Sequence, residues 1–124
     1  MIGRGILVVL DALGIGGAPD ADNYGDKGAD TLGNITKACK EGKANSGRFG
    51  DLEIPNLANL GIFAAHAEAN YDNSHSIEIQ NVQDASFASA TEYSKGKDTP
   101  TGHWELAGVP IEWEWRFFKN KDNT

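Results

Sequence analysis

An apolar run near the start of the chain, residues 6–10 (ILVVL), is followed directly by Asp11. A run of this length, rich in branched side chains and bounded by glycines, is typical of a strand buried on both faces. The glycines and the proline of residues 14–19 then predict a loop. Asp11 is therefore expected at the carboxyl end of a buried strand, which is the edge where open α/β sheets bind ligands.

Two helices are predicted in the first half of the chain. Asp30 or Thr31 is expected to cap a helix with apolar residues at helical spacing, which ends near Gly42. Asn56 is expected to cap a short helix that starts after Pro55. Further strands are predicted before residue 96, where apolar and polar residues alternate around Ile77, Ile79, Val82, Phe87, Ser89, Thr91 and Tyr93.

The decapeptide GKDTPTGHWE, residues 96–105, carries the most informative hydroxyl group. Thr99 precedes Pro100, which disfavours helical angles at Thr99 and suits the first position of a helix. Thr99 is therefore predicted to be an N-cap, which is the commoner role of such a threonine. A phosphate on its oxygen would face free backbone N–H groups and the positive end of the helix dipole.

Charge and composition narrow the classes of partner. The chain has 124 residues, enough for one domain, and a net charge of −7 from 18 acidic and 11 basic residues. This balance argues against nucleic acid or an anionic membrane as partner, and it favours a divalent metal ion as the means of binding an anionic substrate. The single cysteine cannot form an internal disulfide, and no leader or spanning segment is recognised, so a cytoplasmic location is predicted.

The residues that remain suited to chemistry are few. His66 and His75 are predicted to be surface or loop histidines, whereas His103 lies close to Thr99 in the sequence. A threonine hydroxyl is a weak nucleophile that needs a base or a metal, and the Asp11 carboxylate is a hard oxygen ligand for a divalent ion. Asp11 and Thr99 could therefore share one metal centre.

Four sequence blocks then indicate a family. They are LVVLDALGIGGAPDA, YGDKGADTLGNI, IPNLANLGI and GKDTPTGHWELAGVP, at residues 7–21, 24–35, 54–62 and 96–110. In order and spacing they resemble the N-terminal part of the phosphopentomutase family, which belongs to the alkaline phosphatase superfamily. The resemblance covers nearly the whole chain and is weakest over residues 64–85.

The resemblance implies an isomerase that moves phosphate between the C1 and C5 oxygens of ribose or deoxyribose through a 1,5-bisphosphate. It implies that Thr99 is the phosphorylated nucleophile. Asp11 and Thr99 would then be ligands of two divalent ions, usually Mn²⁺, with Mg²⁺ or another divalent ion as the alternative. Lys97, Asp98 and His103 flank Thr99 and would support it, although solvated charges and a core histidine are equally good explanations of these three residues.

The implied fold is α/β, an incomplete alkaline-phosphatase-like core with a central, mostly parallel sheet flanked by helices. Residues 1–106 would form the N-terminal part of the metalloenzyme core, and residues 107–124 would begin the connection to a cap domain. Family members are longer and carry their other metal ligands, Asp and His residues, beyond the matched region. The aromatic residues of 113–118 also need a surface to pack against.

Two hypotheses therefore stand. In the first, the chain is part of a working isomerase of pentose phosphates, which a missing C-terminal polypeptide completes. In the second, it is a catalytically silent fragment or a binding remnant. A weaker alternative keeps the superfamily with another substrate, as in a metal-dependent phosphatase or a phosphoglycerate mutase.

Overall fold

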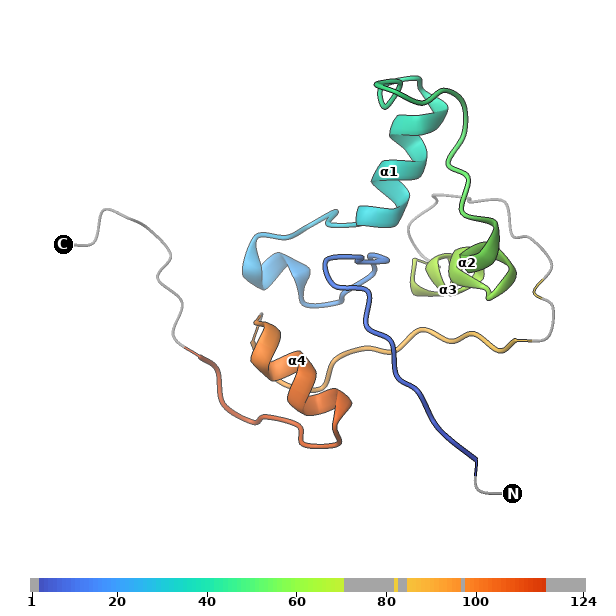
Figure 1. The fold of residues 1–124 in the computed structure, drawn as a ribbon. Coiled ribbons are helices and arrows are strands. Elements are labelled where there is room, and N and C mark those ends of the chain that lie inside the picture. Colours follow the sequence, from blue (N-terminus) through green and yellow to red (C-terminus); the bar gives the residue numbers. More distant parts are fainter. Residues whose placement is uncertain (1–2, 71–81, 83–84, 97, 116–124) are drawn as a thin grey trace. The chain divides into compact units, whose positions relative to one another are not determined.

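A computed structural model of the chain describes residues 3–70, 82, 85–96 and 98–115. The chain divides into two compact units, residues 1–89 and 90–124, and each is described by itself. The elements of the described residues are a short 3-10 helix η1 and four α-helices (Figure 1): η1 Ala21–Tyr24, α1 Thr31–Lys40, α2 Pro55–Asn59, α3 Ile62–Ala69 and α4 Thr99–Leu106. Among the helices that the structure describes, none could span a lipid bilayer.

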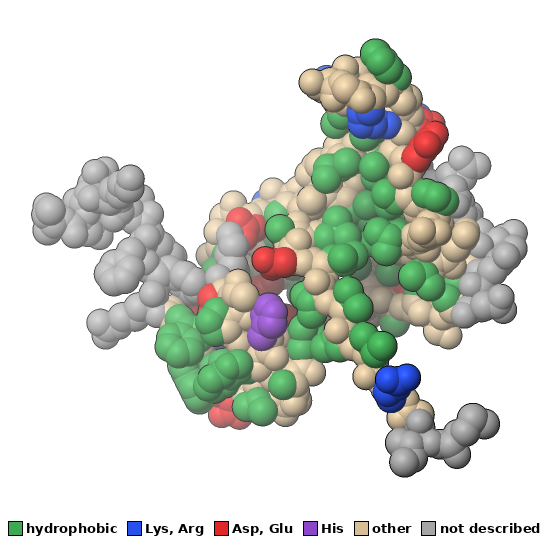
Figure 2. Space-filling view, in the orientation of Figure 1, with side chains coloured by type: hydrophobic (Ala, Val, Ile, Leu, Met, Phe, Trp, Pro, Cys, Tyr) green, Lys and Arg blue, Asp and Glu red, His purple; other side chains and the backbone are tan. Residues whose placement is uncertain are grey.

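The predicted α/β fold with a central, mostly parallel sheet is wrong for the described part of the chain, which contains helices and loops but no strand. Residues 6–10 are irregular, and their side chains are 47–86% exposed. Hydrophobic side chains accordingly lie open at the surface in Figure 2. A strand forms only where a neighbouring segment pairs with its N–H and C=O groups, and no described segment does so here. The predicted strand residues 87–93 are also irregular, whereas Ile77 and Ile79 lie outside the described residues.

The prediction for α1 is confirmed. Asp30 is the N-cap, and its Oδ1 accepts a hydrogen bond from the Gly33 N–H at 2.9 Å. This bond satisfies one of the N–H groups that a helix start leaves without an internal partner. Leu32 and Cys39 form the buried face of the helix, and the chain reverses at Gly42, where φ is +71°.

Helices α2 and α3 follow one another and pack together. Helix α2 begins at Pro55 with Ile54 as N-cap, so the predicted cap at Asn56 is wrong, because proline takes the first position and shifts the start. Helix α3 was not predicted, since its sequence IFAAHAEA has little helical alternation of polar and apolar positions. The apolar core of this unit consists of Leu32, Ala58 and Phe63, with Leu13, Ile15, Leu52, Ile54 and Ile62 packed against it.

A partly buried hydrogen bond connects α1 to α3. His66 of α3 is 0% exposed, so its prediction as a surface or loop histidine is wrong. Its Nε2 lies 2.7 Å from Oδ2 of Asp30, while the other oxygen of the same carboxylate caps α1. Nδ1 of His66 is buried and has no hydrogen-bond partner among the described residues. One carboxylate thus starts α1 and anchors α3.

The loop after Asp11 is held against the end of α3. Asn70 donates from Nδ2 to the carbonyl oxygens of Ile15 at 2.6 Å and His66 at 2.8 Å. Gly17 has φ +75°, and a Cβ at this position would collide with the carbonyl oxygen of Ala69. Only glycine therefore allows this close approach of the loop to α3.

The second unit is organised around α4. The Glu105 carboxylate accepts hydrogen bonds from the N–H groups of Tyr93 at 2.8 Å and Ser94 at 2.7 Å. Ser94 Oγ accepts a bond from the Ile111 N–H at 2.8 Å, and Ile111 is 1% exposed. These bonds tie the segments on both sides of α4 to each other and to the helix. Hydrogen bonding by the Ser94 side chain, followed by the two N–H groups, lowers the pKa of Glu105.

Substitutions of Asp30 test the shared carboxylate. Asp30→Ala removes both the cap and the His66 partner, whereas Asp30→Ser keeps a capping hydroxyl that is too short to serve both. We expect Asp30→Ser to lower the free energy of unfolding by about 1–3 kcal/mol, because His66 stays buried without its partner. Asp30→Ala should lower the free energy of unfolding by about 1 kcal/mol more, because it also removes the cap of α1. Urea denaturation followed by circular dichroism measures both.

Asp20→Ala is the matched control, because Asp20 precedes η1 without a side-chain capping bond. Equal losses at Asp20 and Asp30 would contradict the role given to Asp30.

The lowered pKa of Glu105 predicts an acid-sensitive second unit. Since the pKa of Glu105 in the folded chain lies below the ordinary glutamate value of 4.5, the stabilisation is fully present above pH 4.5 and is lost as the pH falls through the folded pKa. The NMR signals of the Tyr93 and Ser94 amides should report this loss. Glu105→Gln should abolish this acid transition, whereas Glu114→Gln, at an exposed position, should retain it. An unchanged transition in Glu105→Gln would refute the assignment.

Candidate functional site

Thr99 is the first residue of α4, and the N-cap is Asp98. The prediction that Thr99 itself caps the helix is therefore wrong, and Pro100 occupies the second position. Asp98 takes the cap because its backbone is extended, at φ −150° and ψ 151°, and its carboxylate reaches the Thr101 N–H. Thr99 is exposed, and among the described residues no hydrogen bond holds its hydroxyl. The hydroxyl is thus accessible at the start of the helix.

Both oxygens of the Asp98 carboxylate are engaged by one residue. Oδ1 accepts the Thr101 N–H at 2.8 Å, and Oδ2 accepts the Thr101 hydroxyl proton at 2.7 Å. Asp98 was predicted to support Thr99, and this geometry gives it a structural means of doing so, by fixing the first turn of α4.

Few backbone N–H groups remain at the start of α4 for a phosphate. The N–H of Thr101 is bound to Asp98, the N–H of Gly102 donates to the Asp98 carbonyl at 3.3 Å, and Pro100 has none. Of the first four residues, only Thr99 is left with an N–H outside these bonds. Within α4 the expected set of free N–H groups is therefore reduced to that of Thr99, which lies at the positive end of the helix dipole.

His103 lies one turn after Thr99 and is exposed. Its Nδ1 is 2.8 Å from the Thr99 carbonyl oxygen. A carbonyl oxygen only accepts hydrogen bonds, so Nδ1 carries the proton of this bond. In the neutral ring, Nε2 therefore keeps its lone pair and is able to accept a proton or bind a ligand. Lys97, the third predicted supporting residue, lies outside the described residues.

Asp11 belongs to the first unit, whereas Thr99 belongs to the second. Asp11 is exposed at the corner of a turn in which the Leu13 N–H donates to the Leu10 carbonyl at 3.3 Å. The next residue, Ala12, has φ +60°, an uncommon value for a residue other than glycine. Asp11 thus follows an irregular segment rather than a strand. A metal centre shared by Asp11 and Thr99 stays a prediction.

The described residues do not assemble a complete metal site. Among them, no group of three or more His, Cys, Asp or Glu side chains is placed to hold an ion. Metal ions in proteins are usually held by several ligands each. Asp11 and Thr99 therefore do not by themselves fit the two-metal centre that the family resemblance implies.

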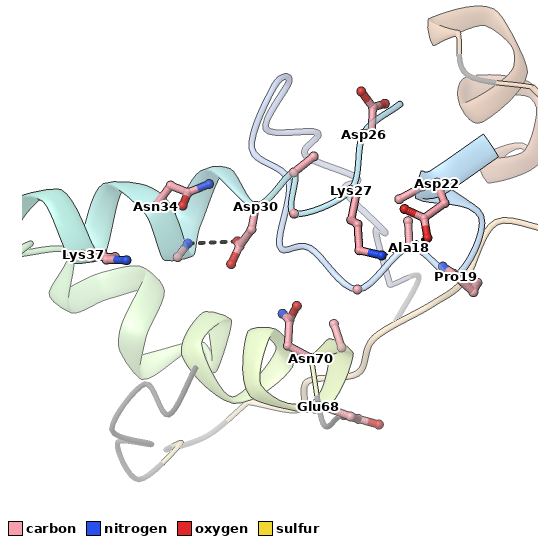
Figure 3. A pocket seen from close by; sticks show the side chains of 16 residues that line it. Ala18, Pro19, Asp22, Asp26, Lys27, Asp30, Asn34, Lys37, Glu68 and Asn70 are labelled. Atoms are coloured by element: carbon pink, nitrogen blue, oxygen red, sulfur yellow. Dashed lines mark hydrogen bonds and ion pairs between the residues drawn. The ribbon is translucent and has the colours of Figure 1, made fainter. Parts of the chain in front are cut away.

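A pocket of about 950 Å³ lies in the first unit, between the loop after Asp11, η1, the start of α1 and the end of α3. Figure 3 shows Asp30 at the start of α1 and Asn70 at the end of α3 on its wall. The charged side chains of its lining are of both signs: Asp22, Asp26, Asp30 and Glu68, with Lys27 and Lys37. Lys27 is paired with Asp22 at 3.2 Å, which reduces the net field that a charged ligand would meet.

Thr101 and Trp115, which support the start of α4, were not predicted from the sequence. Thr101 is 0% exposed, and Trp115 Nε1 donates to its hydroxyl at 2.9 Å. Asp98 stands three residues before Thr101, which is the spacing of an N-cap side chain and the N–H that it binds, and this spacing could have indicated the bond between Asp98 and Thr101. The contact with Trp115, fourteen residues further on, has no comparable local signal.

Comparison with known proteins finds phosphopentomutases among the relatives of this chain. A phosphopentomutase of Shewanella sediminis is 48% identical over 123 residues, which are 98% of this chain and 30% of that relative. A phosphopentomutase of Shewanella denitrificans is 50% identical over 123 residues, with the same coverage. No protein-family model and no solved structure matches the chain. The chain thus spans about 30% of the length of these curated relatives, and its predicted resemblance to the N-terminal part of phosphopentomutases is confirmed.

Proposed function

We propose that this chain carries part of the active site of a phosphopentomutase-type isomerase, which interconverts ribose or deoxyribose 1-phosphate with the 5-phosphate. The relationship to phosphopentomutases over 98% of the chain carries the proposal. The accessible hydroxyl of Thr99 at the start of α4 supports it. The activity belongs to a protein longer than the part matched here.

In this proposal Thr99 carries the phosphoryl group in the resting enzyme. With the 1-phosphate as substrate, the bond between Thr99 Oγ and phosphorus breaks as a bond from phosphorus to the sugar O5 forms. The product of this step is the 1,5-bisphosphate. The phosphoryl group on O1 then moves to Thr99 Oγ, which releases the 5-phosphate and restores the phosphothreonine.

The residues of the second unit have distinct parts in these steps. Asp98 fixes the first turn of α4, so that Thr99 stays at the positive end of the helix dipole. His103, held by the Thr99 carbonyl through Nδ1, offers Nε2 as an acceptor for the sugar hydroxyl proton. Lys97 would add positive charge near the phosphate.

We further propose that Asp11 contributes one oxygen ligand to a divalent-metal site, with Mn²⁺ as the preferred ion. The remaining ligands would come from polypeptide outside this chain, because the described residues supply no complete group. Residues 6–10 favour such a partner, since five consecutive apolar side chains at 47–86% exposure need a covering surface. The cytoplasmic location stays a prediction.

The isolated chain should have no mutase activity with Mn²⁺ and ribose 1-phosphate, because the part of the chain that the structure describes holds no complete metal site. Joining it to the remaining residues of the Shewanella sediminis phosphopentomutase should restore ribose 5-phosphate formation. Thr99→Ala in the joined protein should abolish both turnover and the phosphorylated form seen by intact mass, whereas Thr91→Ala should retain both. Turnover by the isolated chain that disappears in Thr99→Ala would overturn the incomplete-site proposal, and a phosphorylated Thr99→Ala protein would overturn the assigned nucleophile.

Asp11→Asn should weaken Mn²⁺ binding in the joined protein by at least about tenfold, because an amide oxygen is a poorer ligand than a carboxylate. Titration calorimetry or the EPR signal of free Mn²⁺ measures this change. Asp20→Asn, at another exposed carboxylate of the same loop region, is the control. Equal affinity of Asp11→Asn and the unmodified protein would remove Asp11 from the metal site.

A further inference from the structure

We propose that Thr101 and Trp115 are positioning residues that fix the rotation of α4 and thereby the place of the Thr99 hydroxyl. This inference rests on the proposed function for its catalytic meaning, and on hydrogen bonds within the second unit for its geometry. Neither residue needs to touch the substrate.

The burial of Thr101 is the first argument. Its side chain is 0% exposed, although it belongs to a short helix whose other side chains are largely open to solvent. Two residues span about 200° around a helix axis, so Thr101 and Thr99 lie on nearly opposite faces. Burying Thr101 therefore turns Thr99 outward, which agrees with the exposure of Thr99.

The direction of the hydrogen bonds is the second argument. The Thr101 hydroxyl donates to Asp98 Oδ2 at 2.7 Å and accepts from Trp115 Nε1 at 2.9 Å. A buried hydroxyl that donates and accepts at once has one allowed orientation, because either lost bond would leave a polar atom without a partner. Apolar packing alone would not specify the rotation of the helix in this way.

The position of Trp115 in the sequence is the third argument. Its indole reaches back fourteen residues, from the segment after α4 to the first turn of the same helix. The backbone bond from the Lys95 N–H to the Ile111 carbonyl, at 3.2 Å, holds that segment against the residues before α4. The first turn of α4, which carries Thr99, is therefore bonded to the segment after the helix, and that segment is bonded to the residues before it.

The test uses three substitutions and a control. Thr101→Val keeps the shape and removes the hydroxyl, while Thr101→Ser keeps the hydroxyl. Trp115→Phe removes the indole N–H donor and keeps a smaller aromatic ring. Trp113→Phe is the matched control, because Trp113 is exposed and has no hydrogen bond among the described residues.

The first measurement is NMR of the 124-residue chain. In Thr101→Val we expect faster exchange of the Trp115 indole proton and a shifted Thr99 amide signal, and in Trp115→Phe the same shift of Thr99. Thr101→Ser should restore both signals, and Trp113→Phe should leave them unchanged. Unshifted signals in Thr101→Val, or no rescue by serine, would overturn the inference.

The second measurement is kinetics of the joined protein. A misplaced nucleophile should lower kcat roughly 10- to 100-fold in Thr101→Val, with KM for ribose 1-phosphate nearly unchanged and recovery in Thr101→Ser. Unchanged kcat in Thr101→Val would overturn the positioning role. If the unmodified joined protein forms no phosphothreonine, the proposed function fails, and the NMR result still decides whether Thr101 and Trp115 fix Thr99.

Discussion

The first unit depends on one carboxylate that serves two helices. Asp30 caps α1 through Oδ1 and binds His66 of α3 through Oδ2. The small apolar core joins these two helices to α2, and the loop after Asp11 is held to α3 through Asn70. The arrangement is specific because both oxygens act at once and a buried imidazole without a partner is costly. Hydrophobic burial alone is a weaker source of order here, since five apolar side chains near the start of the chain stay open.

Local signals predicted the local features of the fold. The cap of α1 was narrowed to Asp30 or Thr31 and its extent followed from the apolar spacing, because both signals lie within the helix itself. The predicted strand at residues 6–10 failed because pairing depends on a distant segment that composition does not reveal. His66 was misjudged for a similar reason, since its partner is 36 residues away.

In the candidate site, too, local features were predicted from the sequence and long-range contacts were not. The place of Thr99 at a helix start followed from the decapeptide, although the cap is Asp98, one residue before the predicted position. The bonds of His103 and Thr101 follow helical spacing, whereas the contact of Trp115 with Thr101 joins residues with no periodic relation. Asp11 and Thr99 lie in different units. The sequence patterns around each residue are local and do not specify a distance between the two.

The second unit is held mainly by polar bonds, and Ile111 is its one buried large apolar side chain among the described residues. Exposure of apolar surface dominates the heat capacity of unfolding. The segment that carries Thr99 should therefore loosen with a small heat-capacity change and a shallow dependence on denaturant. Its order would fade gradually with warming, so the Thr99 hydroxyl would lose its alignment progressively rather than at one sharp temperature.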